Sequence, residues 1–225
     1  MINEYQRKEI PFDEQNYQRI EYTDHFFPVK NKKVKVKDLG KKSAAIGSFF
    51  YEYLKEYHIP TAFVNLHGSE TLTFLKFTQV PFRVRILNNA DKRTAKIFSI
   101  KEYDPLTFPV FEYHFGEMKD SLVSESHLIS FEICTHDELK FINRLCSKIN
   151  AVLKSFFERR NHSIAEVSCS FGKFENKIIL VDDFTPLSIK IFSNNGDKKA
   201  IDPYKITTAA QMKKYSDHLF KIISS

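Results

Sequence analysis

Apolar residues recur along this chain with two spacings, one typical of helices and the other of strands. Helical spacing is clearest over residues 135–160, where apolar side chains fall on one side of a helix: Leu139, Ile142, Leu145, Ile149, Val152, Leu153 and Phe156. Thr135 and Glu138 have the spacing of a capping box at the start of this helix. The same periodicity predicts helices over about residues 43–57 and 207–223.

Strand-like patterns occupy much of the remaining chain. Short apolar or alternating runs predict strands over residues 8–12, 17–22, 33–37, 62–66, 71–77, 82–87, 95–100 and 110–115. His67-Gly68 and Asn88-Asn89 have turn chemistry and separate successive runs. The pattern therefore predicts an α+β protein whose antiparallel sheets are assembled by local connections.

The segment of residues 163–192 combines a hairpin with polar side chains in a way that could carry chemistry. Alternation along its first strand places Glu166, Ser168 and Ser170 on one face. The opposite face is apolar and is formed by Ala165, Val167, Cys169 and Phe171. Gly172 and Asn176 are expected to bracket the hairpin connection, and residues 178–181 form the return strand.

An acidic pair, Asp182-Asp183, ends the return strand just before a loop that contains Pro186. Two carboxylates at the end of a buried strand are well placed to hold a hydrated divalent cation beside a phosphate. The alternative is a polar strand end that is simply solvated. The pair alone leaves both interpretations open.

The amino-acid composition indicates a protein with an aromatic core and gives no sign of a membrane span or a zinc site. The chain has 225 residues, of which 42% are hydrophobic, with 22 Phe and 10 Tyr, so it can bury a substantial aromatic core. The apolar runs are too short to span a bilayer, and the N-terminal stretch has no apolar signal region. The three cysteines are scattered, which predicts reduced core residues and a cytoplasmic protein. The eight histidines have no HxxxH or HxH spacing, and the cysteines form no CxxC, so the sequence indicates no zinc site.

The chain is basic, with a net charge of +6, and its most basic stretch runs from Lys30 to Lys42. The charge is compatible with a polyanionic ligand such as a nucleotide or a nucleic acid. Alternating lysines within the stretch also suit an edge strand that lysines protect from aggregation. Gly40-Lys41-Lys42-Ser43 does not complete a P-loop, because Lys35 stands where the first glycine of that motif is required.

Several short segments, in order, resemble the SAICAR synthetase family, whose members join an imidazole carboxylate to aspartate using ATP. The segments are Tyr22–Asp24, His58–Thr61, Val80–Val84, Pro109–Tyr113, Asp120–Val123, Lys148–Leu153, Phe156-Phe157 and Ile164–Pro186. The resemblance covers roughly residues 17–205. It implies a two-lobed fold with a cleft between an N-terminal β-rich lobe, residues 1–80, and a C-terminal α+β lobe, residues 81–225, in a single compact unit.

The sequence departs from the family pattern where the resemblance would place the chemistry. The family's N-terminal nucleotide loop is not recognisable, and Ser168 and Ser170 replace a lysine and a glutamate that handle the carboxylate and the magnesium-nucleotide. Leu87-Asn88 replaces the family's Arg-Asn. Residues 91–93 replace the Ala-Gly-Ser that cradles the substrate phosphate. Ordinary SAICAR synthesis is therefore not expected of this chain.

Other elements of the family site are retained, and they define the expected site residues. By the resemblance, Asp182 would bind Mg²⁺ and act in catalysis with Lys190, and Ser168, Ser170 and Asp183 would line the ATP site. The expected substrate-binding residues are Asn88, Arg93, Asp120, Lys190, Asp202 and Lys205.

Three interpretations of function remain open from the sequence. The first is a diverged ATP- and Mg²⁺-dependent ligase that joins a small-molecule carboxylate other than the family's to an amine. The second is a catalytically inactive homologue, a pseudoenzyme that serves as a binding or scaffold protein. The third, a nucleic-acid-binding module, rests only on the net charge and the Lys30–Lys42 stretch. No membrane association is expected, and the sequence is compatible with a homo-oligomer.

Overall fold

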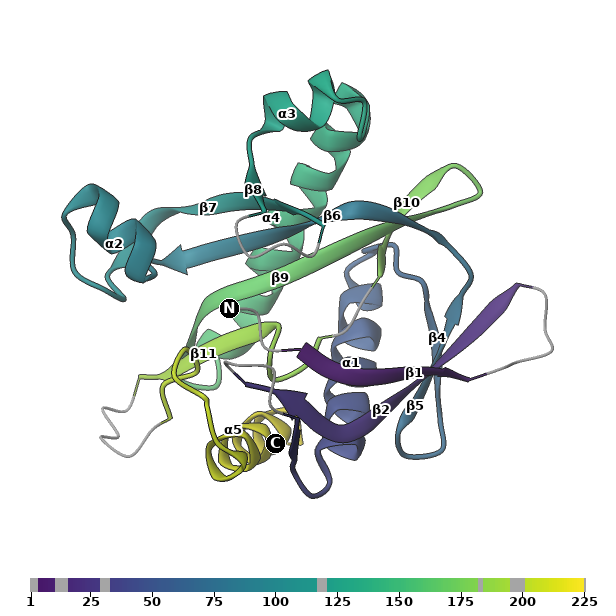
Figure 1. The fold of residues 1–225 in the computed structure, drawn as a ribbon, viewed down its shortest axis with the longest axis vertical. Coiled ribbons are helices and arrows are strands. Elements are labelled where there is room, and N and C mark those ends of the chain that lie inside the picture. The colour runs from purple at the N-terminus through teal and green to yellow at the C-terminus, as the bar shows by residue number, and fades with distance from the viewer. Residues whose placement is uncertain are drawn as a thin grey trace.

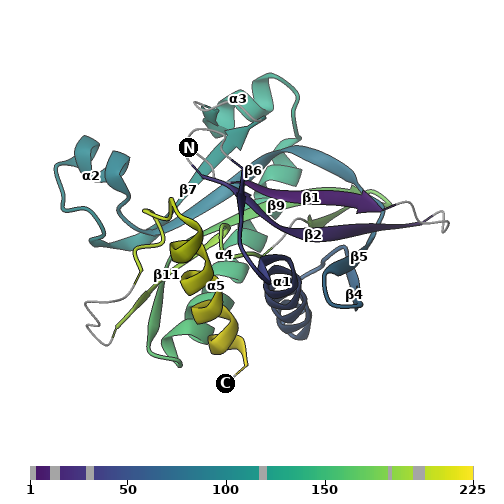
Figure 2. The same ribbon diagram turned by 60° about the horizontal axis from the view of Figure 1, so that its bottom comes forward.

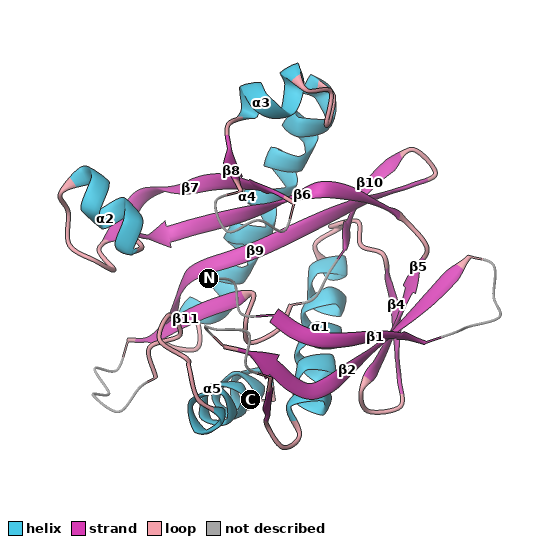
Figure 3. Ribbon diagram, in the orientation of Figure 1, coloured by secondary structure: helices cyan, strands magenta, loops and turns pink. Residues whose placement is uncertain are grey.

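The computed structural model describes residues 4–10, 16–28, 33–116, 121–181, 184–194 and 201–224, with side chains from residue 8 onward. Two antiparallel sheets and their helices make up this part of the chain (Figures 1 and 3). The expected α+β class, with antiparallel sheets and packed helices, is therefore confirmed.

The first sheet is built from the N-terminal part of the chain. Its strands are β1 (Glu4–Ile10), β2 (Tyr17–Phe27), β3 (Val34–Lys35), β4 (Phe63–His67) and β5 (Thr71–Leu75). The order is β1-β2-β5-β4, and the short β3 pairs with β2. The pairs β1-β2, β2-β3 and β4-β5 are neighbours in sequence, whereas β2 and β5 pair although β3, α1 and β4 lie between them in the chain.

The second sheet carries most of the expected site residues. Its strands are β6 (Thr78–Asn89), β7 (Pro105–Phe115), β8 (Leu122–Val123), β9 (His162–Phe174), β10 (Lys177–Val181) and β11 (Ile189–Ser193). The order is β10-β9-β6-β7-β8, and β11 pairs with the first half of β9. β9 and β6 are therefore the central strands.

Five helices complete the described elements: α1 (Leu39–Glu56), α2 (Lys92–Phe98), α3 (Glu125–Ser130), α4 (His136–Glu158) and α5 (Ala209–Ile223). α4 packs behind β9 and β6, and α1 lies beside α5 (Figures 1 and 2). The other face of the second sheet is left for polar side chains.

An aromatic cluster joins the helices of the two sheets. The ring of Phe50 in α1 lies 5.4 Å from Phe156 and 5.7 Å from Phe157, both in α4, and 6.1 Å from Phe184. A backbone bridge also connects Thr61, just before β4, with Leu180 in β10. The two sheets therefore share one core, and the division at residues 80/81 stays a prediction.

Several predicted elements differ from the structure. Residues 95–100 were expected to form a strand, but they overlap helix α2. The reason is local, because the Asp91 carboxylate accepts a hydrogen bond from the Thr94 amide and caps this helix. The hairpin turn is also shifted: β9 continues through Gly172 to Phe174, and Glu175 and Asn176 turn the chain with positive φ. α1 begins at Leu39 rather than at Ser43, and the sequence pattern did not predict α3.

The cysteines have the predicted character. Cys134, Cys146 and Cys169 are all buried and free of disulfide bonds, and burial raises the pKa of the Cys146 thiol. Across the described ranges, no helix combines the length and the apolar composition needed to cross a membrane.

Candidate functional site

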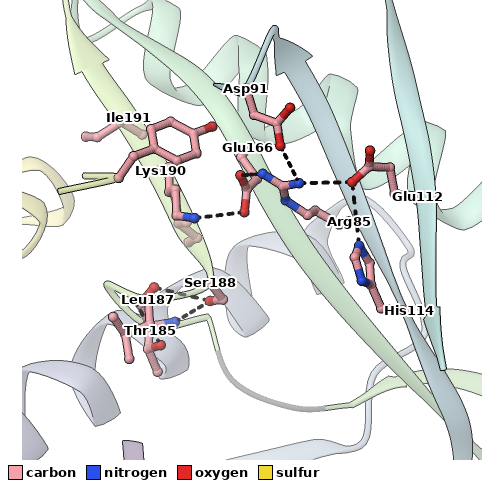
Figure 4. A network of polar contacts seen from close by, with 12 residues as sticks. Arg85, Asp91, Glu112, His114, Glu166, Thr185, Leu187, Ser188, Lys190 and Ile191 are labelled. Carbon is pink, nitrogen blue, oxygen red and sulfur yellow. Dashed lines mark hydrogen bonds and ion pairs between the residues drawn. The ribbon is translucent and has the colours of Figure 1, made fainter. Parts of the chain in front are cut away.

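The polar face of the second sheet holds a buried network of charged side chains centred on Arg85 (Figure 4). Val84 and Ile86 of β6 are buried in the core, and strand alternation turns Arg85 to the opposite face. Arg85 donates one Nη1 hydrogen bond of 2.9 Å to Asp91 and another of 2.9 Å to Glu112. Its Nη2 donates to Glu166 over 2.6 Å. One guanidinium thus joins carboxylates from β7, β9 and the start of α2.

Two further cations complete the network. Lys190 of β11 lies directly opposite Glu166 in the strand register, and its Nζ donates to the Glu166 carboxylate over 3.0 Å. Arg93 of α2 donates to Glu112. Asp91, Glu112 and Glu166 thus balance the charges of Arg85, Arg93 and Lys190.

Burial and the neighbouring charges have opposite effects on the pKa values of these groups. Burial alone would raise the pKa of Glu166, but Lys190 and Arg85 lower it to about 2. For Glu112 burial also acts to raise the pKa, and contacts with His114, Arg85 and Arg93 lower it overall. Burial disfavours charge on Arg85, yet Glu166, Asp91 and Glu112 raise its pKa. At neutral pH Glu166, Glu112 and Arg85 are therefore ionised.

A second cluster connects to this network through Tyr204. Asp202 accepts a hydrogen bond from the Tyr103 hydroxyl over 2.9 Å and forms a 3.0 Å ion pair with Lys205. The Tyr204 ring stacks on Tyr103 with centroids 5.5 Å apart, and Lys190 Nζ lies 4.4 Å from the centroid of Tyr204. Lys190, Asp202 and Lys205, which the sequence singled out separately, therefore belong to connected parts of one site.

Ser168 and Ser170 lie on the face that strand alternation predicted, opposite two arginines of β6. In the β6–β9 register Arg85 pairs with Ser168 and Arg83 with Ser170. Ser170 is buried, and Ser168 is partly buried. Arginines on the neighbouring strand therefore accompany both serines.

The loop that follows the acidic pair is tied to the same strand. Ser188 accepts a hydrogen bond from the Ser168 amide at its carbonyl oxygen over 2.9 Å. Its hydroxyl oxygen accepts another from the Thr185 amide over 2.8 Å (Figure 4). These bonds fix the approach of the chain to β11 and Lys190.

Not every expected residue joins this site. The Asn88 side chain exchanges two hydrogen bonds, of 2.8 and 2.9 Å, with Asn150 of α4 and so faces the helix instead. Asp120, Asp182 and Asp183 lie outside the described residues. Within the described ranges, no group of three or more histidine, cysteine, aspartate or glutamate side chains is arranged to hold a metal ion.

A cavity of about 620 Å³ adjoins the network at Arg93 and Glu112. Its other walls come from β7, β8 and the start of α3, and they include Pro109, Phe111 and Val123. This volume is within the range of small-molecule sites. The arrangement can hold a compact ligand against a fixed set of paired charges.

Four of the central residues were not predicted as site residues: Arg85, Asp91, Glu112 and Glu166. Arg83 and Arg85 alternate with apolar residues in the sequence of β6, which could have indicated a charged strand face. Their carboxylate partners come from other elements, and a single sequence does not reveal such pairings.

A known protein family matches this chain over most of its length. Residues 10–218 match the family described as SAICAR synthetase. A phosphoribosylaminoimidazole-succinocarboxamide synthase of Wolbachia pipientis is 30% identical over 159 residues, which cover 68% of this chain and 66% of the relative.

Solved structures agree on the fold. The same-named enzyme of Ehrlichia chaffeensis superposes with a TM-score of 0.89 at 23% identity, covering 97% of this chain and 95% of the other. A SAICAR synthetase solved in complex with ADP gives a TM-score of 0.88 at 22% identity, covering 98% and 97% of the two chains. The resemblance found in short sequence segments therefore extends over nearly the whole fold, and the chain belongs to the SAICAR synthetase family.

Proposed function

We propose that this protein is an ATP-dependent ligase that joins a carboxylate to an amine, and that its carboxylate substrate differs from that of the named relatives. Family membership and the ADP bound to a structural neighbour support the use of ATP. The observation that carries the difference in substrate is the pairing of two of the expected substrate-binding cations: Arg93 with Glu112 and Lys205 with Asp202.

The pairing changes which substrates are favoured. A phosphorylated substrate is bound best by cations that have no competing internal carboxylate. Here each of these cations already has such a partner, so a substrate with several negative charges would have to displace it. A less highly charged carboxylate would fit the cavity beside Arg93 and Glu112 with these pairs intact.

The proposed reaction has two steps. A carboxylate oxygen of the substrate attacks the γ-phosphorus of ATP, which gives an acyl phosphate and releases ADP. The amine nitrogen then attacks the acyl carbon, expels phosphate and loses a proton, so that an amide remains. Lys190, held in place by Glu166, would stabilise negative charge on the transferred phosphoryl group.

The low pKa of Glu166 limits its own role. A carboxylate with a pKa of about 2 is a weak base at neutral pH, so we assign Glu166 to positioning Lys190 rather than to accepting the amine proton. Mg²⁺ binding by Asp182 and Asp183 remains a prediction about residues outside the described ranges, and within those ranges no group of three or more histidine, cysteine, aspartate or glutamate side chains is arranged to hold a metal ion. No step is therefore assigned to a metal ion.

The first test is calorimetric titration of the purified protein with ATP in the presence of Mg²⁺. We expect saturable binding that is lost in Asp182→Ala. A second variant, Lys190→Met, has Lys213→Met as its matched control, which removes an exposed lysine of α5 that pairs with Asp217. ADP release would then be measured with a panel of carboxylates and amines. We expect Lys190→Met to lower turnover by about 10²–10³, the usual effect of removing one such contact.

Two results would contradict the proposal. Absence of binding at millimolar ATP would leave the second interpretation, an inactive homologue that serves as a binding or scaffold protein. Ser168 and Ser170, which stand where the resemblance expects a lysine and a glutamate, favour that candidate. Turnover of the named relatives' own substrate at an ordinary rate would overturn the proposed change of carboxylate.

A further inference from the structure

Two histidines that are distant in sequence meet at the junction of β9 and α5. His162 is the first residue of β9, and His218 lies in the second half of α5. Their Nε2 atoms are 3.0 Å apart, and the ring centroids are separated by 4.9 Å with a tilt of 54°. His162 lies on the same strand as Glu166 of the Arg85 network, but the proposed ligase reaction does not use the histidine pair.

The orientation of His162 is fixed by the backbone. Its Nδ1 lies 2.6 Å from the carbonyl oxygen of Arg160, so this nitrogen donates its proton there. In the neutral ring the lone pair is then on Nε2, which faces His218. Histidines that bind metals commonly donate their second ring nitrogen to a backbone carbonyl in this way.

The separation of the two nitrogens also suits a shared metal ion. With metal–nitrogen distances of about 2.0–2.1 Å and a nitrogen–metal–nitrogen angle of roughly 90°, the two ligand nitrogens lie about 2.9 Å apart. Such neighbouring positions occur in square-planar and octahedral coordination, which Cu²⁺ and Ni²⁺ favour with nitrogen ligands. A tetrahedral ion would require the nitrogens to move apart by a few tenths of an ångström.

We propose that His162 and His218 form a binding site for a borderline divalent transition-metal ion such as Ni²⁺ or Cu²⁺, with water in the remaining positions. His162 is only 9% exposed, whereas His218 is exposed, so an ion would enter from the solvent side of α5. Nearby charged groups are already paired. Asp217 binds Lys42 and Lys213, and Arg160 packs over Phe156 and donates to the Ile222 carbonyl.

A metal ion at this position would fasten the last helix to the second sheet. Tyr215 lies one turn before His218, and its hydroxyl donates to the Ile189 carbonyl over 2.8 Å and accepts from the Ile191 amide over 3.1 Å. These two residues flank Lys190 in β11. The metal would therefore stabilise the helix that supports this strand.

The test uses untagged, chelator-treated full-length protein and titration with NiCl₂, followed by calorimetry and thermal unfolding. We expect one Ni²⁺ ion per chain and a rise in melting temperature. Altering a residue that only hydrogen-bonds to a metal ligand commonly lowers metal affinity about 10- to 100-fold. His218→Ala and His162→Ala each remove a proposed ligand itself, so each should lower the Ni²⁺ affinity by at least that factor. MgCl₂ should have no comparable effect, because Mg²⁺ prefers oxygen ligands.

His67→Ala serves as the control, since His67 is an exposed histidine of β4, and its Ni²⁺ affinity should equal that of the wild type. His218 is exposed, so its variant keeps the test decisive even if loss of the buried His162 ring prevents folding. Equal affinity of the wild type and His218→Ala would overturn the proposal, as would no binding at all. Either result would leave the two imidazoles as a direct hydrogen-bonded pair.

Discussion

Glu166 is a carboxylate with almost no contact with solvent, and two cations keep it ionised. Its side chain is 4% exposed, and its two oxygens accept hydrogen bonds from Arg85 and Lys190. Removing one partner of a buried ion pair usually costs several kcal/mol, because the remaining charge stays buried without compensation. Glu166 is therefore the residue where charge and stability are most closely linked.

We expect Glu166→Gln to lower the free energy of unfolding by about 3 kcal/mol at pH 7. The pKa of Glu166 falls from 4.5 to about 2 on folding, so its stabilising contribution is complete above about pH 4.5 and is lost as the pH falls toward 2. The difference in stability between wild type and variant should therefore shrink between pH 5 and pH 3 in urea unfolding.

The control for this experiment is Glu158→Gln, which removes an exposed carboxylate 3.9 Å from Lys154. An exposed pair contributes about 0–1 kcal/mol, so this variant should unfold like the wild type at both ends of the pH range. A difference for Glu166→Gln that stays constant down to pH 3 would show that the glutamine acts through packing rather than through charge.

At the scale of elements, the position of α1 depends on its first turn. Asp24 of β2 accepts hydrogen bonds from the amides of Asp38 and Gly40, over 3.2 and 3.0 Å. Gly40 packs so closely that a Cβ atom would lie 2.2 Å from the carbonyl oxygen of Tyr22. The start of the helix is therefore fixed by contact with β2, four residues before the start that its apolar pattern predicts.

We expect Gly40→Ala to destabilise the protein by about 1–3 kcal/mol, the usual cost of overpacking, because β2 and α1 must separate. Gly47→Ala in the same helix is the matched comparison. There the nearest side-chain atom, of Leu72, would be 3.3 Å away, and the helix propensity of alanine offsets the closer contact. Thermal unfolding would measure the stability of both variants. Equal destabilisation by Gly40→Ala and Gly47→Ala would argue against the contact with β2 as the cause.

Individual elements differ in how far their sequence predicts them. The long helix was predicted within two residues, because Thr135 and Glu138 cap α4 as expected and its apolar side is continuous. Residues 95–100 were misassigned because the cap at Asp91 outweighs a short apolar run. For the site, the polar face of β9 was predictable from alternation alone. Its partner Arg85 was not, because strand order and register decide that contact.

At the scale of the whole molecule, the two sheets are parts of one packed body. The aromatic cluster of Phe50, Phe156, Phe157 and Phe184 takes rings from both sides of the predicted boundary at residues 80/81. Removal of a ring from such a cluster affects both sheets, since interiors are packed as tightly as crystals.

We therefore expect a single cooperative unfolding transition rather than one for each predicted lobe. Scanning calorimetry should give equal calorimetric and van't Hoff enthalpies, and circular dichroism and tyrosine fluorescence should report the same midpoint. Phe156→Ala should lower that midpoint for both probes together, at a cost of about 3–5 kcal/mol. Two separated transitions, or a variant that shifts only one probe, would instead support lobes that unfold independently.

The bridge between Thr61 and Leu180 has a consequence for how the protein is made. The Ala62 amide donates to the Leu180 carbonyl over 2.9 Å, and the Leu180 amide donates to the Pro60 carbonyl over 2.8 Å. These partners leave the ribosome on the order of ten seconds apart, at a synthesis rate of about 5–20 residues per second. Until β10 emerges, the Pro60 carbonyl and the Ala62 amide lack these partners, so the contact between the two sheets can form only late in translation.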